Sequence, residues 1–141
     1  MIVKIKRLNH DVVLPKYAYP GDAGLDLYSR ENYTLKPDER HEFALGFALE
    51  FPKGFAGLIW DKGSISFLHG IHTTGGVFDA GYRGEYKIML INLSRKTHKI
   101  KKGDKIAQLL IQPVENVKLI EVSAISKSRR GQGRLGSTGK K

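Results

Sequence analysis

The sequence predicts an all-β domain, and three observations support this fold class. Short apolar runs are separated by turns rich in glycine, proline and aspartate. The clearest run, 42–51, alternates large apolar residues with small or charged ones, and a period of two indicates a strand with one buried face. Only 64–69 has the pattern of a short helix, which Gly70 is placed to end. Many short strands joined by such turns are typical of a β-barrel or β-sandwich.

The expected strands follow one another along the chain without an internal repeat. They lie at residues 1–5, 42–51, 55–60, 86–93, 106–111 and 117–122, of which the first and last are the weakest. The turn Pro52-Lys53-Gly54 makes 55–60 the expected returning strand after 42–51. The large side chains of the clearest strand should face the core, and they are Phe43, Leu45, Phe47, Leu49 and Phe51.

Length and composition favour one β domain, residues 1–125, followed by a charged arm. A chain of 141 residues with 40% hydrophobic content suits a single domain with its own core. The absence of cysteine excludes disulfides and thiolate metal sites, and it fits a reducing cytoplasm. No apolar run approaches a transmembrane span, and the N-terminus lacks the pattern of a signal peptide. We therefore expect a cytoplasmic protein without a membrane partner.

The last sixteen residues, 126–141, form the arm. They carry six basic residues and no acid, and Leu135 is their one large apolar side chain, so a flexible arm is expected. The net charge is +10, so the arm accounts for +6 and the rest of the chain for only +4. Because nucleic-acid binding would charge a whole face, this asymmetry favours an anion met mainly by the arm. A solvated basic tail and an RNA-binding arginine–glycine segment remain alternatives for the arm itself.

Two carboxylates could take part in chemistry. In 75–85, four glycines surround Asp79 and Tyr82, and glycine at that density marks tight turns or backbone that lies against a ligand. Asp79 could act there as a general base, or it could cap an ordinary hairpin turn. Asp26, between two leucines, could help to hold a divalent ion, or it could lie on the solvent face of a strand.

Two further segments could bind phosphate. The turn at 61–66 precedes the short helix, and Lys62 would add positive charge to the amides there, although a capped helix with a surface lysine explains the same residues. Gln108 lies among apolar residues, so a buried position would require hydrogen-bond partners for its amide. The five histidines lack paired ligand spacing and are expected to be surface or structural residues.

Taken in order, five segments resemble the five motifs of the homotrimeric dUTP pyrophosphatases (dUTPases) in sequence and spacing. They are AGLDL at 23–27, DKGSIS at 61–66, GGVFDAGYRGE at 75–85, GDKIAQLL at 103–110 and RGQGRLGSTG at 130–139. The resemblance implies a jelly-roll-like (β-clip) barrel and a homotrimer whose three active sites are shared between subunits. It also implies hydrolysis of dUTP to dUMP and pyrophosphate, with Mg²⁺ as the cofactor.

The resemblance further implies a role for each matching residue. Asp79 would activate the water that attacks the α-phosphorus, Tyr82 would pack beneath the deoxyribose, and Asp26 would hold magnesium through water. The other substrate-binding residues would be Lys62, Gly63 and Ser64 at the phosphates, Gly75, Gly76, Val77, Phe78 and Lys87 at the uracil edge, Gln108 in the phosphate and water network, and Arg130, Leu135, Gly136 and Ser137 in the arm. Closure of such an arm would exclude water from the triphosphate.

The chain departs from the family pattern in its second, third and fifth segments. The family usually has Pro-Arg-Ser-Gly where this chain has 61–64, Asp-Lys-Gly-Ser. Lys62 keeps the charge but loses the bidentate geometry of arginine, and the serine has moved by one position. Gly81 stands where an acid is common. Leu135 replaces the usual aromatic residue of the arm, so stacking on uracil becomes an apolar cover.

Two alternative functions are less consistent with the residues. A dCTP deaminase, or a bifunctional deaminase–dUTPase, would need a glutamate in the strand after the third motif. This chain has Met89 there and no acid from 86 to 102. An RNA-binding β-barrel would need exposed aromatic residues on a strand face, whereas Phe43, Phe47 and Phe51 fall on the same face as two leucines. We therefore predict dUTP hydrolysis, with no nucleic acid as partner.

Overall fold

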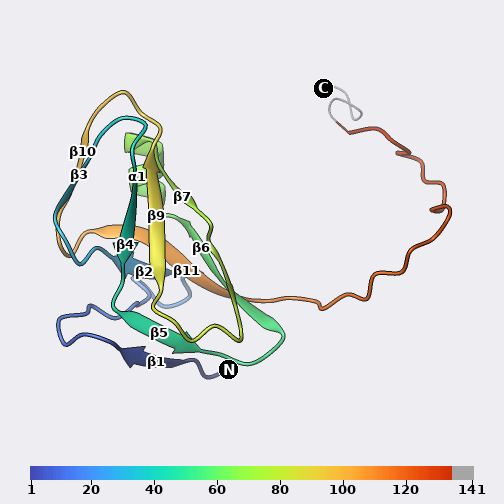
Figure 1. Ribbon diagram of the computed structural model, residues 1–141, viewed down its shortest axis with the longest axis horizontal. Helices are drawn as coiled ribbons and strands as arrows, with labels where there is room; N and C mark the ends of the chain where they lie inside the picture. The colour runs from blue at the N-terminus through green and yellow to red at the C-terminus, as the bar shows by residue number, and fades with distance from the viewer. Residues whose placement is uncertain (135–141) are drawn as a thin grey trace.

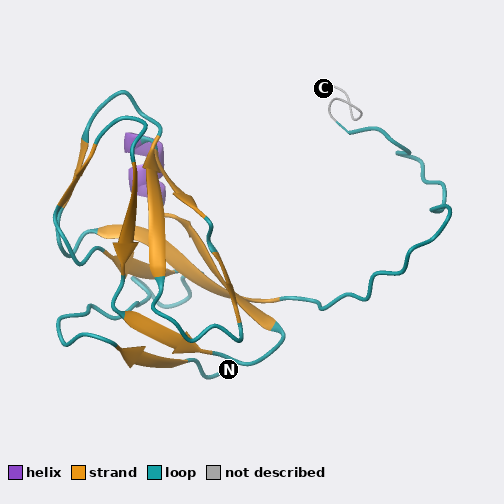
Figure 2. Cartoon of the chain, in the orientation of Figure 1, coloured by secondary structure: helices purple, strands orange, loops and turns teal. Residues whose placement is uncertain are grey.

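The computed structural model describes residues 1–134 and shows a jelly-roll-like β body from which the C-terminal segment extends (Figure 1). Strands dominate the body and the helix among them is short (Figure 2), so the predicted all-β fold is confirmed. The elements are β1 (Lys4–Arg7), β2 (Leu25–Tyr28), β3 (Tyr33–Leu35), β4 (Arg40–Ala44), β5 (Phe47–Glu50), β6 (Phe55–Asp61), α1 (Gly63–His69), β7 (Ile71–Thr74), β8 (Val77–Asp79), β9 (Lys87–Asn92), β10 (His98–Ile100) and β11 (Lys105–Pro113). Within residues 1–134, no helix is long and apolar enough to cross a membrane.

The strands form four antiparallel groups. The largest sheet has the order β2-β11-β6-β8, so that β11 lies between β2 and β6. A second sheet has the order β4-β9-β7, and the pairs β1-β5 and β10-β3 complete the body. Most partners are far apart in the sequence, which is the connectivity expected of a jelly roll rather than of successive hairpins.

The core contains the large apolar side chains that these sheets enclose. Those with almost no exposed surface are Leu27, Leu35, Phe43, Leu45, Phe47, Ile71, Tyr86, Ile88, Leu90, Ile106 and Leu109. All five residues of 42–51 that were predicted to face the core are buried, which confirms the interpretation of their alternation. Full burial of one such side chain stabilises the fold by about 1.5–3 kcal/mol. These phenylalanines therefore do not form the exposed aromatic face that an RNA-binding barrel would need.

The prediction of one continuous strand over 42–51 is wrong, because the chain breaks into β4 and β5 at Gly46. Its φ of 73° lies in the left-handed region that favours glycine. A Cβ atom there would also lie 2.5 Å from Cγ2 of Val12 and 2.9 Å from Nε of Arg30. The break sends β4 to β9 and β5 to β1. The expected return of 55–60 along 42–51 is wrong for a related reason, since β6 pairs with β11 and β8 instead.

Gly46→Ala is expected to destabilise the fold by about 2 kcal/mol or more, because the left-handed backbone and the overlap with Val12 both oppose a side chain. Urea unfolding followed by circular dichroism measures the loss. The matched control is Gly54→Ala, where φ is 83° but no atom lies within 4 Å of the added carbon. Equal losses for the two variants would show that the contact with Val12 costs nothing.

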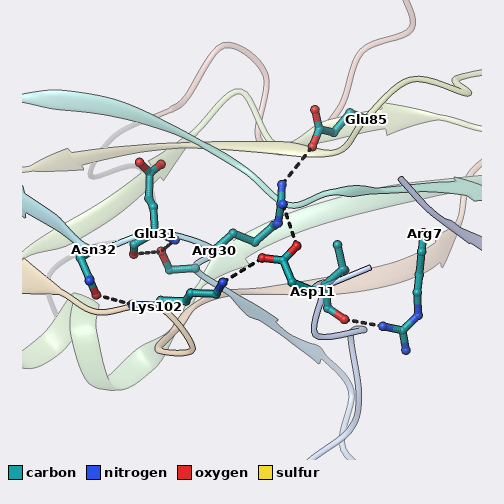
Figure 3. A network of polar contacts seen from close by, with 9 residues as sticks. Arg7, Asp11, Arg30, Glu31, Asn32, Glu85 and Lys102 are labelled. Atoms are coloured by element: carbon teal, nitrogen blue, oxygen red, sulfur yellow. Dashed lines mark hydrogen bonds and ion pairs between the residues drawn. The ribbon is translucent and has the colours of Figure 1, made fainter. Parts of the chain in front are cut away.

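A polar network joins the loops beside this break (Figure 3). The carboxylate of Asp11 accepts hydrogen bonds from Nζ of Lys102 at 2.8 Å and from Nη2 of Arg30 at 3.0 Å. These two donors, Lys102 first, lower the pKa of Asp11 to about 2. Nη1 of Arg30 also lies 4.0 Å from Glu85, whose carboxylate accepts a hydrogen bond from the amide of Gly46. The network therefore fixes the end of segment 75–85 against the N-terminal half of the body.

The predicted strand at 117–122 is wrong for this single chain. Residues 114–134 form no helix or strand and extend away from the body (Figure 1). The apolar side chains of this segment are between 61% and 90% exposed at Val117, Leu119, Ile120 and Val122. An apolar strand pattern without a partner in its own chain indicates a segment that is completed by another surface. The boundary between body and arm at residue 125 stays a prediction.

Candidate active site

Asp26 lies between two lysines where β2, β6 and β11 meet. Its side chain is only 3% exposed, and Nζ of Lys62 donates a hydrogen bond of 2.6 Å to Oδ1. Nζ of Lys105 forms an ion pair with Oδ2 at 2.7 Å. Burial alone raises the pKa of Asp26, but the two ammonium groups outweigh this effect and hold it below its usual value. We call these three residues the lysine cluster.

The structure therefore shows a residue, Lys105, that the sequence analysis did not assign. Its signal in the sequence was its place in the segment 103–110, three residues before Gln108. Ser64, at the start of α1, and Lys105 line the same cavity of about 400 Å³. Of the five segments that resemble family motifs, 75–85 does not reach this place with its carboxylate, because Asp79 lies opposite Ala56 at the other end of β6. Segments 23–27, 61–66 and 103–110 do come together here.

Gln108 has the hydrogen-bond partner that its position required. Its Nε2 donates to the main-chain oxygen of Asp61 at 2.8 Å. In register, Gln108 lies opposite Asp26 on one side and Trp60 on the other, so the three side chains form a row across β2, β11 and β6. A Cβ atom at Gly24 would lie 2.7 Å from Oε1 of Gln108. Glycine at that position thus leaves room for the amide beside the lysine cluster.

The glycine-rich segment 75–85 forms the second candidate group; it contains β8 and the turn that follows, and we call it the hairpin, although β8 pairs with β6 rather than with a strand of the segment itself. Gly75 has a φ of 67°, and the carbonyl of Gly76 accepts a hydrogen bond of 2.7 Å from the amide of Ile59. A Cβ atom on Gly76 would lie 2.5 Å from the main-chain oxygen of Ile59, so only glycine permits the two backbones to come this close. Strand β8 then leads to Asp79, which is exposed. Within residues 1–134, the Asp79 carboxylate makes no hydrogen bond or ion pair, and it is free to accept a proton from water.

Aromatic rings of the hairpin pack against aromatic rings of the core. Phe78 stacks on Tyr86 with ring centres 4.2 Å apart, and Tyr86 stacks in turn on Phe47. Tyr82 packs at an angle beside Phe78, is 40% exposed, and donates its hydroxyl hydrogen to the carbonyl of Glu85 at 2.9 Å. Burial raises the pKa of Tyr86 to about 12, so this ring remains neutral. Tyr82 therefore lies partly exposed beside Asp79, whose main-chain oxygen accepts a hydrogen bond of 3.0 Å from the amide of Tyr82.

The side chains of Lys87 and Arg130 have hydrogen-bond partners that restrict what else they can contact. Nζ of Lys87 donates a hydrogen bond of 2.8 Å to Glu42, which raises the pKa of Lys87 and leaves its main chain as the group for the expected uracil contact. Val77 is 70% exposed beside the hairpin glycines. In the arm, the guanidinium of Arg130 donates to the carbonyl of Gly133 at 2.9 Å. Leu135, Gly136 and Ser137 lie outside the described residues.

Asp79 and the lysine cluster lie at opposite ends of β6, because the hairpin runs along this strand from Gly76, beside Ile59, to Asp79, beside Ala56. Asp79 is opposite Ala56 in register, whereas Lys62 follows the last residue of the strand. Lys62 lies six positions after Ala56, which corresponds to about 20 Å along a strand. One chain therefore brings Asp26, Lys62, Ser64 and Gln108 together but keeps Asp79 and Tyr82 away from them.

The described residues offer no ready-made metal site. No group of three or more histidine, aspartate or glutamate side chains converges within residues 1–134. Asp26, the predicted magnesium ligand, has an ammonium group within 2.7 Å of each oxygen. A divalent cation beside two ammonium groups would be repelled. The carboxylate as it stands in this structure does not fit a magnesium ion.

Comparison with known proteins agrees with the order of the motifs. A family model described as dUTPase matches residues 10–139. The deoxyuridine 5'-triphosphate nucleotidohydrolase of Clostridium kluyveri is 43% identical over 141 residues, which cover 99% of each chain. Among solved structures, a variant of the Staphylococcus bacteriophage 80alpha dUTPase with dUpNHpp superimposes with a TM-score of 0.89, at 27% identity and over 98% of each chain. The dUTPase of S. aureus phage phi11, described with a structural Mg(II) ion, is 24% identical with a TM-score of 0.83, over 90% of this chain and 100% of its own.

The fold, the ordered segments and these relatives lead to the same family. The family model spans well over half of the chain, and the bacterial relative is matched along nearly its full length. The chain belongs to the dUTPase family.

Proposed function

We propose that this protein hydrolyses dUTP to dUMP and pyrophosphate, with Asp79 as the general base. The observation that carries the proposal is the exposed carboxylate of Asp79, which has no hydrogen bond or ion pair among residues 1–134 and lies on the glycine-lined hairpin near the tilted ring of Tyr82. Asp79 takes a proton from water as the water oxygen bonds to the α-phosphorus. The bond from that phosphorus to the bridging oxygen of the β-phosphate breaks, and pyrophosphate leaves with the electron pair.

In this proposal, the hairpin binds the uracil and the deoxyribose, and the residues around the lysine cluster bind the phosphates. The hairpin main chain at 75–78 and at Lys87 contacts the uracil edge, and Tyr82 lies beneath the deoxyribose, where a ribose 2′-hydroxyl would meet the ring. Lys62, Gly63 and Ser64 contact the phosphates, and Gln108 orients the phosphates and water. The arm residues Arg130, Leu135, Gly136 and Ser137 close over the nucleotide. Positive groups around the triphosphate stabilise the charge that develops as pyrophosphate departs.

We further propose a homotrimer in which each site takes groups from several subunits. The separation of about 20 Å along β6 leaves each chain with two incomplete half-sites. A second copy that sets its hairpin against the lysine cluster of the first would complete one site. The exposed apolar residues of 114–125 support an assembly, because such a segment is stabilised when a neighbouring subunit covers it. A cytoplasmic location stays a prediction from the composition.

Magnesium is part of the proposal as a companion of the substrate. Phosphate oxygens are ligands that magnesium prefers, so the ion can enter as a complex with the triphosphate. Because Asp26 does not fit the ion in this structure, no step of the reaction is assigned to magnesium through that residue.

The purified protein is expected to release pyrophosphate from dUTP and to turn over UTP and dTTP at least ~100-fold more slowly, because contacts in a closely fitted pocket reject an added group. Steady-state assays with dUTP, UTP, dTTP and dCTP measure the ratios of kcat/KM. Comparable rates for UTP and dUTP would contradict the role of Tyr82. Ammonia released from dCTP would favour the deaminase and contradict the argument from Met89.

A further inference from the structure

The carboxylate of Asp61, at the end of β6, collects four hydrogen-bond contacts. Its Oδ1 accepts from the amide of Thr73 at 2.7 Å and from the hydroxyl of the same residue at 2.8 Å. Its Oδ2 lies 2.7 Å from Nδ1 of His72 and accepts from the hydroxyl of Ser66 at 3.1 Å. Burial alone raises the pKa of Asp61, but these donors outweigh it and hold that pKa below its usual value. The side chain is therefore an anion in which each of the two carboxylate oxygens has two hydrogen-bond contacts.

These contacts connect Asp61 to three elements around the lysine cluster. Thr73 and His72 belong to β7, and Ser66 belongs to α1. The main-chain oxygen of Asp61 holds Nε2 of Gln108, which lies on β11. The next residue is Lys62, whose Nζ reaches Asp26. One residue thus fixes the turn that carries Lys62 and the amide of Gln108.

The turn after Asp61 has little restraint of its own. Among the described residues, Lys62 makes no side-chain hydrogen bond to cap α1, and Gly63 has no side chain to restrict its backbone and no atom within 4 Å of where a Cβ would lie. Because a free turn would have to be ordered at each binding event, this lack of restraint would weaken phosphate binding. The four contacts of Asp61 supply the restraint.

We propose that Asp61 is a positioning residue for phosphate recognition, which orients Lys62 and Gln108 through its contacts with β7 and α1. The proposal rests on the proposed function, since it assumes that these two residues meet the phosphates of dUTP. Asp61 itself does not touch the substrate in this scheme. Its effect should therefore grow with the number of phosphates on the ligand.

Asp61→Asn is the main test. Its amide oxygen can still accept from Thr73, which is buried, whereas its amino group cannot accept from Ser66 or His72. We expect the variant to fold, to bind a non-hydrolysable dUTP analogue about 10-fold more weakly, and to bind dUMP within about twofold of the original protein. Calorimetry with the two nucleotides measures the split, and KM for dUTP should rise in parallel.

Two further variants keep the test decisive if Asp61→Asn does not fold. Ser66→Ala removes the contact with α1, and His72→Ala removes one contact with β7, while both leave the acceptor of Thr73 in place. Each should weaken the analogue by about threefold without a change in dUMP affinity. The matched control is Glu50→Gln, which breaks an exposed ion pair with Lys4 and should alter neither affinity.

The outcomes separate this inference from the proposed function. Equal losses for dUMP and the analogue would show a general structural role and overturn the proposal, as would an unchanged affinity for both. Absence of pyrophosphate release by the original protein would contradict the proposed function instead. The ratio of analogue affinities between variant and original protein would still test Asp61 in that case.

Discussion

Asp79→Asn is expected to keep the fold and to bind dUTP but to lower turnover by at least ~100-fold, the size typical of losing a general base. Asparagine is nearly isosteric with aspartate and still forms hydrogen bonds, yet it cannot accept a proton at neutral pH. The substitution should not disturb the hairpin, because the Asp79 carboxylate makes no hydrogen bond or ion pair within the described residues. Steady-state release of pyrophosphate measures the loss, and calorimetry with a non-hydrolysable analogue measures binding.

The control for this variant is again Glu50→Gln, which changes an exposed acid that pairs with Lys4. It should leave turnover unchanged, whereas Asp79→Asn removes nearly all of it. Thermal unfolding of both variants should match that of the original protein. Near-normal turnover of Asp79→Asn would place the base elsewhere.

Truncation after Ile125 is expected to leave a folded trimer that has lost at least ~100-fold in turnover, comparable to the loss of a group that stabilises the transition state. The fold should persist because the last strand, β11, ends at Pro113 and every core residue precedes it. Binding of the uracil part should change little, since that contact belongs to the hairpin. Size-exclusion chromatography tests assembly, and steady-state assays separate kcat from KM. Undiminished turnover would show that the arm is a solvated tail.

The two inactive variants together test whether a site is shared. If the hairpin and the arm of one site come from different subunits, trimers that mix Asp79→Asn chains with truncated chains will contain some sites with a normal hairpin and a normal arm. Random assembly from equal amounts should restore about a quarter of the original activity in the whole population, and about a third in mixed trimers after isolation. Both variants should be co-expressed with different tags and the mixed trimers isolated. Activity no higher than that of the separate variants would mean that one subunit supplies both groups.

Much of the fold could be predicted because alternation reports burial directly. The residues of 42–51 were correctly placed in the core, and the helix at α1 (Gly63–His69) ends at Gly70 as expected. Alternation does not report which strands pair, so the partners of β6 and the break at Gly46 were missed. Short strands such as β3 and β10, of three residues each, are too brief to show a period.

The sequence indicated candidate residues for the site but not how they are arranged. The order of the five segments indicated Asp26, Asp79 and Gln108 as candidates. Their separation depends on β6, whose two ends are assigned by pairing with β8 and β11. The roles of Lys105 and Asp61 were missed because each is defined by contacts with distant parts of the chain. The apolar pattern at 117–122 indicated a strand, but a sequence does not say whether the partner belongs to the same chain.

The length of β6 has a genetic consequence. In the proposed trimer, the two ends of β6 belong to different active sites. A subunit that lacks only Asp79 therefore inactivates one of the three sites, and a subunit that lacks only the arm inactivates another. A chain defective in the hairpin, the lysine cluster and the arm would contribute a damaged part to every site. One such subunit would inactivate all three sites of a trimer. Combined lesions should therefore be strongly dominant over the normal gene. Each lesion alone should reduce the activity of mixed trimers only partly.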